Sequence, residues 1–332
     1  MIPTCEPFIT IEDRQAVGTA LRLGHVALGP EVEWFEEAIA KRTGLPYAVA
    51  TSSGSAALHL AVKLIGYTRW SVPALTFIAA AEAVLHNGAE LEIVDHLRPA
   101  NISVNFYGHP PPPLPYGRLI EDACEGLGSF PLGAADITCL SFNGNKIITT
   151  GGGGMLLTRD RALADAARQY VSHCRTDGVQ YIHAGPGFNF RMPAMNAALG
   201  LSQLARLDAH VASKRETAAH YESLGLHLLQ PDPGTTSTFW MPVALLDRSA
   251  APIIGALQAE GIMARAVWYP LHHQPALDGA ARTPCEKADD LWRRGIILPC
   301  SVGITPQERE QVVQALRRAL DTADGAALLR PS

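Results

Sequence analysis

The chain has 332 residues, of which 47% are hydrophobic and 18% charged, and its formal net charge is −5. This composition is ordinary for a globular protein with one large core or two domains. Acidic and basic residues are interspersed without any basic run, which argues against nucleic acid or a membrane surface as the partner.

The N-terminal segment has no basic stretch followed by an apolar one, so we expect no signal peptide. The sequence contains no uninterrupted run of about 18 apolar residues, so we expect no transmembrane helix. The six cysteines are scattered without a C-x-x-C pair, which favours free thiols in a cytoplasmic protein over disulfides, and we expect no metal site. They are Cys5, Cys124, Cys139, Cys174, Cys285 and Cys300.

Along the chain, Thr10 is expected to cap a helix over residues 11–22, and a second helix over 31–42 should end at Gly44. An apolar strand at 47–51 is followed by four small residues, 52–55, and an apolar helix to residue 65. Such a strand–turn–helix unit can bind an anion at the helix N-terminus. An ordinary capped helix explains these residues equally well.

Further short apolar runs alternate with helical segments, a pattern typical of a largely parallel α/β sheet. After Arg159, amphipathic stretches cover 160–175 and 193–224. We expect a large domain over 1–220 and a small α/β domain over 221–332. The expected strands are 70–73, 91–95, 102–107, 119–122, 137–142 and 154–157, then 237–245 and 263–268; late helices are expected at 252–260 and 305–322.

Three residues stand out as candidates for chemistry. Lys146 lies in a turn before the glycines 151–154, where its amine could form an imine with an aldehyde cofactor, although a solvated loop lysine is the common alternative. Asp122 ends an expected parallel strand and so should face the ligand crevice, unless it only caps a turn. Phe77 could stack on a cofactor ring or simply pack in the core.

Taken together, ordered motifs from about residue 10 to 320 resemble the DegT/DnrJ/EryC1/StrS family of pyridoxal-phosphate (PLP) dependent sugar aminotransferases. The motifs are Gly29-Pro30 with Phe35-Glu36, Ser53-Gly54-Ser55-Ala56-Ala57-Leu58-His59, Pro73 with Thr76-Phe77, Glu121-Asp122-Ala123 with Gly126, Ser141-Phe142 with Lys146, Gly187-Phe188-Asn189-Phe190-Arg191-Met192, Pro270-Leu271-His272 with Gln274-Pro275, and Leu298-Pro299.

The resemblance implies a type I PLP-dependent transferase fold: a mostly parallel seven-stranded sheet with helices on both faces, plus a smaller C-terminal α/β domain. It also implies a homodimer with shared active sites. In the implied roles, Lys146 binds the PLP aldehyde, Asp122 pairs with the pyridine nitrogen, Phe77 stacks on the ring, and Glu125 lies beside it. Gly54, Ser55 and Ser141 hold the phosphate, Asn189 reaches the neighbouring subunit's cofactor, and the sugar lies near Ala27, His183, Arg265 and Trp268.

The implied reaction moves an amino group from glutamate to a nucleotide-linked keto-sugar, for surface polysaccharide or glycan biosynthesis. Residues 141–155 look most like enzymes that aminate C4 of 4-keto-6-deoxy sugars; the sugar, the nucleotide and C3 against C4 amination stay open. Two alternatives remain. One is a PLP-dependent sugar dehydratase, in which His replaces the lysine; the other is a non-catalytic or regulatory PLP-binding relative.

The chain departs from this family between Asp95 and Glu121, where two crossover helices are expected to be missing. The first link, 96–101, can span the return past one strand, because six extended residues reach about 20 Å. The second contains five prolines within 110–115 and should be extended polyproline. One sheet face should therefore lose its helical cover, and a partner chain or another protein would cover it.

Overall fold

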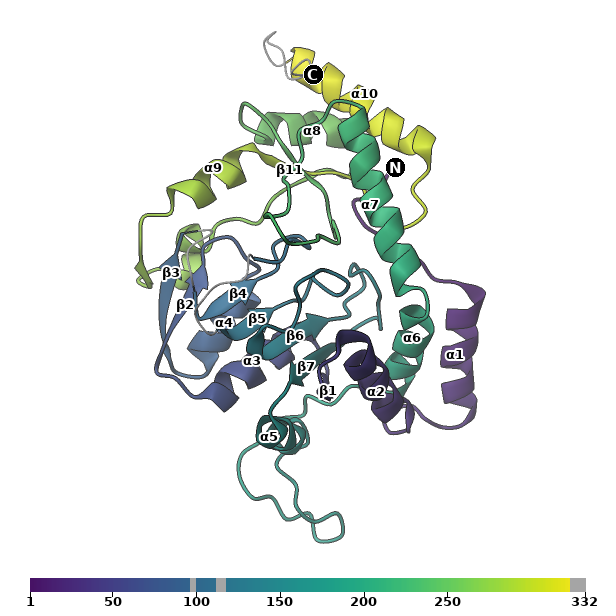
Figure 1. Cartoon of the computed structure of the whole chain (residues 1–332), viewed down its shortest axis with the longest axis vertical. Helices are drawn as coiled ribbons and strands as arrows, with labels where there is room; N and C mark the ends of the chain where they lie inside the picture. Colours follow the sequence, from purple (N-terminus) through teal and green to yellow (C-terminus); the bar gives the residue numbers. More distant parts are fainter. Residues whose placement is uncertain (96–99, 112–117, 323–332) are drawn as a thin grey trace.

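A computed structural model describes residues 1–95, 100–111 and 118–322. Five strands hydrogen-bond in the order β1-β7-β6-β5-β4, β2 pairs with β3, and β2 lies beside β4, so that seven strands form one layer (Figure 1). Among the described strands of this layer, only β7 runs antiparallel to its neighbours. The strands are β1 (Tyr47–Thr51), β2 (Arg69–Pro73), β3 (Glu90–Val94), β4 (Ile102–Val104), β5 (Arg118–Asp122), β6 (Ala135–Ser141) and β7 (Gly154–Thr158), with β10 (Ala281–Arg282) along the free edge of β3. The mostly parallel α/β sheet is confirmed.

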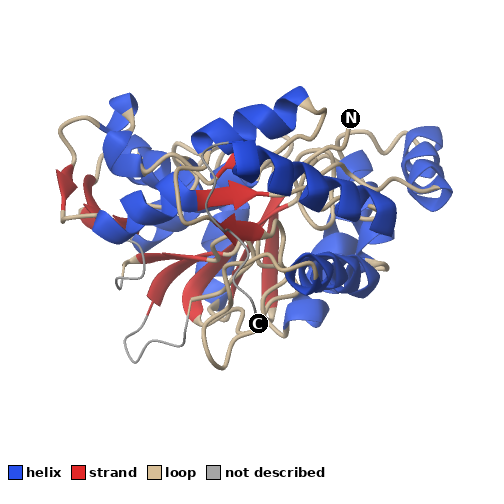
Figure 2. Ribbon diagram, turned by 90° about the horizontal axis from the view of Figure 1, so that it is seen from above, coloured by secondary structure: helices blue, strands red, loops and turns tan. Residues whose placement is uncertain are grey.

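Helices surround this layer, as Figure 2 shows. The central helix α3 packs on β5, β6 and β7, flanked by α4 and α5, while α2 packs on β1 and α6, and α1 packs on α6. No helix in the described part of the chain is long and apolar enough to cross a bilayer. The helices are α1 (Ile11–Arg22), α2 (Glu31–Thr43), α3 (Gly54–Ile65), α4 (Ala79–His86), α5 (Arg161–Val171), α6 (Ala194–Leu204) and α7 (Leu207–Ser223).

The helix ends follow their capping residues. Thr10 forms a capping box with Asp13 at the start of α1, and Gly44 ends α2 with a φ of 70°. Both helices and β1 therefore lie where the sequence predicts them, to within one residue. The predicted strand over 102–107 is shorter, because Tyr107 turns the chain with a φ of 51°. The short helix α4 was not predicted.

The C-terminal part has a second hydrophobic core, to which the long helix α7 leads (Figure 1). Ile2 joins this core and forms a bridge with Ile262, so the N-terminal segment packs on the C-terminal part. The division at residue 220 stays a prediction. The elements are β8 (Val243–Leu245), α8 (Ala251–Ala259), β9 (Arg265–Ala266), the 3-10 turns η1 (Leu271–His273) and η2 (Pro275–Leu277), α9 (Glu286–Arg294), β11 (Gly295–Ile297) and α10 (Pro306–Thr322); α9 and β11 were not predicted.

The two faces of the sheet differ in chemistry. On the face toward α3, the buried side chains in register on β4, β5 and β6 are all isoleucine: Ile102, Ile120 and Ile137. Because side chains alternate along a strand, the next residues face the opposite side. These are Ser103, Glu121 and Thr138. A doubly covered parallel sheet is normally apolar on both faces, so this polar face suits a layer without helices behind it.

The connections on this polar side contain no helix within residues 95, 100–111 and 118–122. Residues 96–99 and 112–117, which include most of the predicted polyproline segment, lie outside the described residues. The expectation that this face needs a partner is wrong for its centre, since Ser103 and Glu121 are already buried within one chain. The Glu121 carboxylate accepts hydrogen bonds from the Gly133 amide at 2.8 Å and the Thr138 hydroxyl at 3.1 Å, so the loop after β5 covers it.

Asn101 links the two parts of the layer. Its side-chain oxygen accepts hydrogen bonds from the backbone amide and the hydroxyl of Ser71, both at 2.9 Å. The backbone amide of Asn101 donates to the Ser71 hydroxyl at 2.9 Å. Its carbonyl accepts from the Ile120 amide at 3.1 Å. A single residue thus bridges β2, through its side chain, to β5, through its backbone carbonyl.

We therefore expect Asn101→Ala to lower the free energy of unfolding by about 1–3 kcal/mol, because the Ser71 amide loses its acceptor. Urea denaturation measures this loss. Asn101→Asp is the matched control, since it keeps the accepting oxygen and should retain most of the stability. Equal stability of the alanine and aspartate variants would contradict the bridging role.

Candidate active site

A cavity of about 490 Å³ opens at the carboxyl ends of β4, β5 and β6, against the N-terminus of α3. This is the edge at which open parallel sheets bind ligands. The cavity brings together most of the residues that the sequence singled out. Those lining it are Gly54, Ser55, Phe77, Asp122, Glu125, Ser141, Lys146, Arg265 and Trp268.

One end of the cavity is the first turn of α3. The Ser53 hydroxyl accepts the Ala56 amide at 3.0 Å, which fixes the helix start. First-turn amides have no acceptor within a helix, and the dipole makes this end positive. Gly54 and Ser55 line the cavity here together with Ser141. This end is therefore suited to an anionic group such as a phosphate.

Two glycines permit the close approach of chain segments that forms this end. A Cβ atom on Gly54 would lie 2.8 Å from the Ser141 Cβ and 2.9 Å from the Cys124 sulfur. A Cβ atom on Gly154, at the start of β7, would lie 2.3 Å from the Ser53 carbonyl oxygen. The sequence places small residues where β6, β7 and the turn before α3 meet, which lets these segments approach closely.

Lys146 lies at the centre of the cavity wall. Its Nζ donates to Glu125 Oε1 at 3.0 Å and lies 4.1 Å from the ring centroid of Trp240, and its side chain is only 13% exposed. Burial raises the pKa of Glu125 to about 8, although the charge of Lys146 acts to lower it. The Glu125 Oε2 accepts the Tyr107 amide at 3.1 Å. Glu125 and Trp240 thus hold the lysine amine in one position.

Asp122 is buried at the end of β5, where its carboxylate accepts the Cys124 amide at 3.2 Å. Burial raises its pKa, while hydrogen bonds from Cys124 and the charge of Lys146 act in the opposite direction. Within the described residues Asp122 forms no ion pair. A buried carboxylate without a cation is costly, so a positively charged ligand group here would be stabilised.

An aromatic wall closes the far side; the sequence indicated its Trp268 but not Tyr107 or Trp240. The Tyr107 ring stacks on Trp268, with centroids 4.5 Å apart, and on Trp240 at 5.6 Å. The Tyr107 hydroxyl accepts the Trp268 amide at 3.1 Å. Trp240 lies almost one hundred residues after Lys146 in the chain, and no motif marked it. Phe77, 55% exposed, remains available to contact a ligand.

Three predicted residues lie outside this cavity in the single chain. Ala27 belongs to the loop before α2, where its carbonyl accepts the Ala194 amide. His183 and Asn189 are exposed in the segment after α5, and the His183 ring contacts the His173 carbonyl at 2.8 Å. The predicted roles of Ala27 and His183 near the sugar, and of Asn189 at the neighbouring subunit's cofactor, stay predictions.

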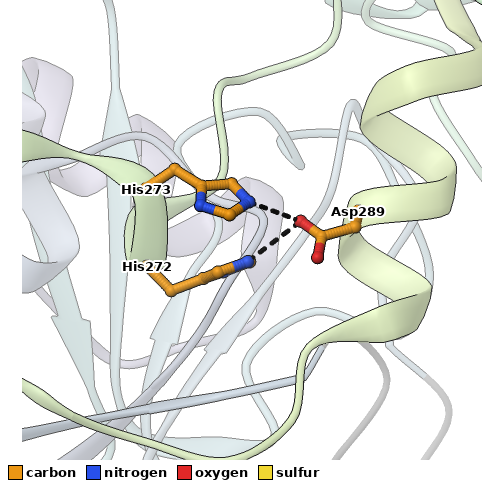
Figure 3. A group of neighbouring side chains, drawn as sticks. All are labelled: His272, His273 and Asp289. Carbon is orange, nitrogen blue, oxygen red and sulfur yellow. Dashed lines mark hydrogen bonds and ion pairs between the residues drawn. The ribbon is translucent and has the colours of Figure 1, made fainter.

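A separate polar cluster joins η1 to α9. The Nε2 atoms of His272 and His273 lie 2.9 and 2.8 Å from the same oxygen of Asp289 (Figure 3). The three side chains have spacing that could hold a metal ion. Hydrogen bonds to the carboxylate already account for these contacts, and the prediction of no metal site stays a prediction.

The cavity fits PLP group by group. The positive end at α3 matches the phosphate, the buried Asp122 carboxyl matches a protonated pyridine nitrogen, and the Lys146 amine matches the aldehyde. The close contacts at Gly54 and Gly154 leave no space for a larger side chain, so the segments that form the anion end pack directly on one another. Ser141 and Glu125 line the same cavity and would lie near a cofactor bound in it.

The raised pKa of Glu125 predicts a pH-dependent effect of Glu125→Gln on the cofactor-free protein. The pKa of Glu125 in the folded state is about 8 and exceeds the ordinary value of 4.5. Between these two pH values the folded state therefore binds more protons than the unfolded state. Wild-type stability should therefore fall as pH rises through this window, relative to the variant. Unfolding midpoints from pH 5 to 9 should show an advantage of the variant that grows up to about pH 8. Glu33→Gln, on the exposed face of α2, controls for the loss of one charge. A stability advantage of Glu125→Gln that shrinks as pH rises would contradict the prediction.

Comparison with known proteins agrees with this geometry. The profile of the DegT/DnrJ/EryC1/StrS aminotransferase family matches residues 7–105 and 118–317. The chain is 32% identical to EpsN of Bacillus subtilis (strain 168) over 370 residues, covering 96% of this chain and 95% of that protein. It is also 32% identical to the GDP-perosamine synthase of Caulobacter vibrioides over 338 residues, covering 89% of this chain and 91% of the other.

The fold is shared with Spr1654 from Streptococcus pneumoniae in its PLP form, with a TM-score of 0.89 and 21% identity over 98% of this chain and 100% of that one. The unmatched residues 106–117 lie between β4 and β5 in the sequence and include Tyr107 of the aromatic wall, whereas the residues that line the cavity itself lie in matched segments. The chain is a member of the DegT/DnrJ/EryC1/StrS aminotransferase family.

Proposed function

We propose that the chain, with PLP bound at Lys146, transfers an amino group from glutamate to a nucleotide-linked keto-sugar, of the 4-keto-6-deoxy class, for polysaccharide or glycan biosynthesis. One observation carries this proposal: the Lys146 amine, the Asp122 carboxyl and the N-terminus of α3 line the same cavity. The relative named GDP-perosamine synthase supports a nucleotide-linked amino sugar as product.

When bound, PLP supplies an electron sink for the carbon that loses its proton. Lys146 is placed to hold the cofactor and to move the proton at the substrate carbon, since its amine faces the cavity between Glu125 and Trp240. Asp122 would pair with the ring nitrogen of the bound cofactor and so favour its protonated form. Gly54, Ser55 and Ser141 would hold the phosphate at the N-terminus of α3.

The substrate side of the cavity is polar and aromatic. Arg265 and Trp268 line it from the C-terminal part of the chain. The Arg265 guanidinium can pair with a carboxylate of glutamate or with a diphosphate, both of which accept bidentate hydrogen bonds. The Trp268 ring, stacked on Tyr107, offers an aromatic surface to a sugar ring.

We further propose a homodimer in which the segment after α5 reaches the neighbouring site. Residues 172–190 extend away from the body of the chain (Figure 1). This segment exposes Val179 by 88% and Tyr181 by 67%, which is unusual for a segment that stays in water. It also carries His183 and Asn189, whose polar side chains are exposed rather than turned into their own cavity. A partner's cavity would receive both.

Lys146→Ala should reduce amino transfer by at least about 1,000-fold, because the variant loses the group that moves the proton. Stopped-flow assays with glutamate measure this. The visible absorbance of lysine-bound PLP should vanish, while PLP still binds without a covalent bond. Lys63→Ala, on the exposed side of α3, is the control and should keep both activity and absorbance. A Lys146→Ala variant that retains wild-type turnover would reject the assignment.

Mixing two inactive variants tests the shared site. Asn189→Ala and Lys146→Ala chains, allowed to exchange, should recover up to about a quarter of wild-type activity, because half of the dimers would contain one intact site of two. A mixture of Lys146→Ala with Asp122→Asn should recover none, since both residues belong to the same chain's cavity. If exchanging subunits give equal activity in both mixtures, or a monomer is fully active, Asn189 does not act across an interface.

A further inference from the structure

A cluster of two cysteines and a lysine lies just behind the cavity. Lys214, on α7, is buried with 1% exposure, and its Nζ donates to the carbonyls of Cys300 at 2.9 Å and Trp240 at 3.0 Å. The same atom lies 3.3 Å from the Cys5 sulfur and 3.6 Å from the Cys300 sulfur. The N-terminal segment meets this point because the Cys300 amide donates to the Thr4 carbonyl at 2.8 Å.

A buried ammonium requires a neighbouring anion or several acceptors. Within the described residues Lys214 contacts two carbonyls and two sulfurs and forms no ion pair with a carboxylate. The only partners that can become anions are therefore the thiols. Burial acts to lower the pKa of Lys214. Its interactions with Cys300 and Cys5 are stronger than this effect, and the pKa of Lys214 is raised.

The two thiols are not equivalent. A hydrogen bond from the Cys300 thiol and the charge of Lys214 lower the pKa of Cys5, in spite of its burial. Burial and the hydrogen bond to Cys5 raise the pKa of Cys300. The half-buried Cys5 is therefore the sulfur that loses its proton more readily, and the fully buried Cys300 is the one that keeps it.

The other cysteines provide a contrast within the same chain. Burial raises the pKa of Cys124, Cys139 and Cys285, and the charge of a nearby aspartate adds to this in each case. None of these three has a lysine amine hydrogen-bonded to its sulfur among the described contacts. Since the thiolate is the reactive form, the structure distinguishes Cys5 from them.

We propose that Cys5 and Cys300 are a covalent modification site, at which a hydroperoxide oxidises Cys5 and Cys300 then closes a disulfide. The Cys5 thiolate attacks the hydroxyl oxygen of the hydroperoxide, the O–O bond breaks, and the leaving alkoxide or hydroxide takes a proton, which leaves a sulfenic acid on Cys5. The Cys300 sulfur attacks the Cys5 sulfur, the S–O bond breaks, and water leaves. Two thiols and one hydroperoxide give one disulfide, one alcohol or water, and a further water.

Lys214 assists the second step as well as the first. Once Cys5 carries a neutral sulfenic acid, the negative charge that held the Cys300 proton in place is gone, while the ammonium remains 3.6 Å from the Cys300 sulfur. Deprotonation of Cys300 then becomes more favourable, because an opposite charge stabilises the thiolate. The site therefore activates its two sulfurs in sequence.

The cluster also contacts residues that position Lys146. Trp240, whose carbonyl accepts from Lys214, lies with its ring against the Lys146 amine. Its indole N–H donates to the Asn145 carbonyl at 2.7 Å, and the Cys5 sulfur lies 3.3 Å from the same oxygen. Oxidation of the pair would therefore alter the support of the residue next to Lys146.

Treatment of the PLP-loaded protein with hydrogen peroxide, followed by alkylation, digestion and mass spectrometry, tests the proposal. We expect a Cys5–Cys300 peptide pair joined with loss of two hydrogens and reversed by dithiothreitol. Cys300→Ser should instead accumulate a sulfenic acid on Cys5 that a 1,3-diketone traps. Cys285→Ser is the matched control and should form the same linked pair as the wild type.

The thiolate itself is tested without oxidant. Iodoacetamide should modify Cys5 at pH 7 about 10-fold faster in the wild type than in Cys300→Ala, which removes the hydrogen bond to the Cys5 sulfur. Circular dichroism confirms that the variant is folded. Three results would each overturn the disulfide site. The first is that Cys5 and Cys300 stay unlinked and unoxidised after peroxide treatment, and the second is an equal alkylation rate of Cys5 in both proteins. The third is a cross-link from Cys5 to Lys214 that retains an oxygen atom.

Discussion

The organisation of this protein depends on how charge is buried at the carboxyl edge of its sheet. Asp122 and Glu125 are both removed from water, and the one amine that reaches them, Lys146, hydrogen-bonds to Glu125 rather than to Asp122. Asp122 is left facing the cavity with an elevated pKa. At the opposite end, the N-terminus of α3 presents a positive dipole. The cavity is therefore polarised, and it is complementary to a ligand with a cationic ring nitrogen and an anionic phosphate.

Holding those charges in place requires rigid supports that carry no charge themselves. The tight packing of β7 against the turn before α3, possible only with glycine at 154, fixes the anion end. The stack of Tyr107, Trp240 and Trp268 fixes the lysine end from the other part of the chain. Because Trp240 also contacts the Lys214 cluster through its carbonyl, the wall of the cavity rests on a second buried cation, which contacts two carbonyl oxygens and two sulfurs.

The sequence predicts the front half of this arrangement well, because each feature there has a local cause. Thr10 and Gly44 fix helix ends, and the small residues 52–55 mark the anion end. Lys146, Asp122 and Glu125 were accessible only through the ordered family motifs, since each alone is compatible with an ordinary loop or turn. Trp240, Tyr107 and the pairing of Cys5 with Lys214 depend on contacts between segments far apart in the chain, for which no local spacing exists.

The polar rear of the sheet has a consequence for how this architecture can change in size. Where the strands of a sheet are apolar on both faces, removal of a crossover helix exposes an apolar surface to water, so the helix cannot be deleted without loss of stability. Here Ser103, Glu121 and Thr138 are polar side chains that a loop can cover through hydrogen bonds, as the Gly133 amide does for Glu121. The connections behind the sheet can therefore shorten or lengthen while the strand ends in front keep their positions, so the chemistry and the outer dimensions of the protein are free to vary separately.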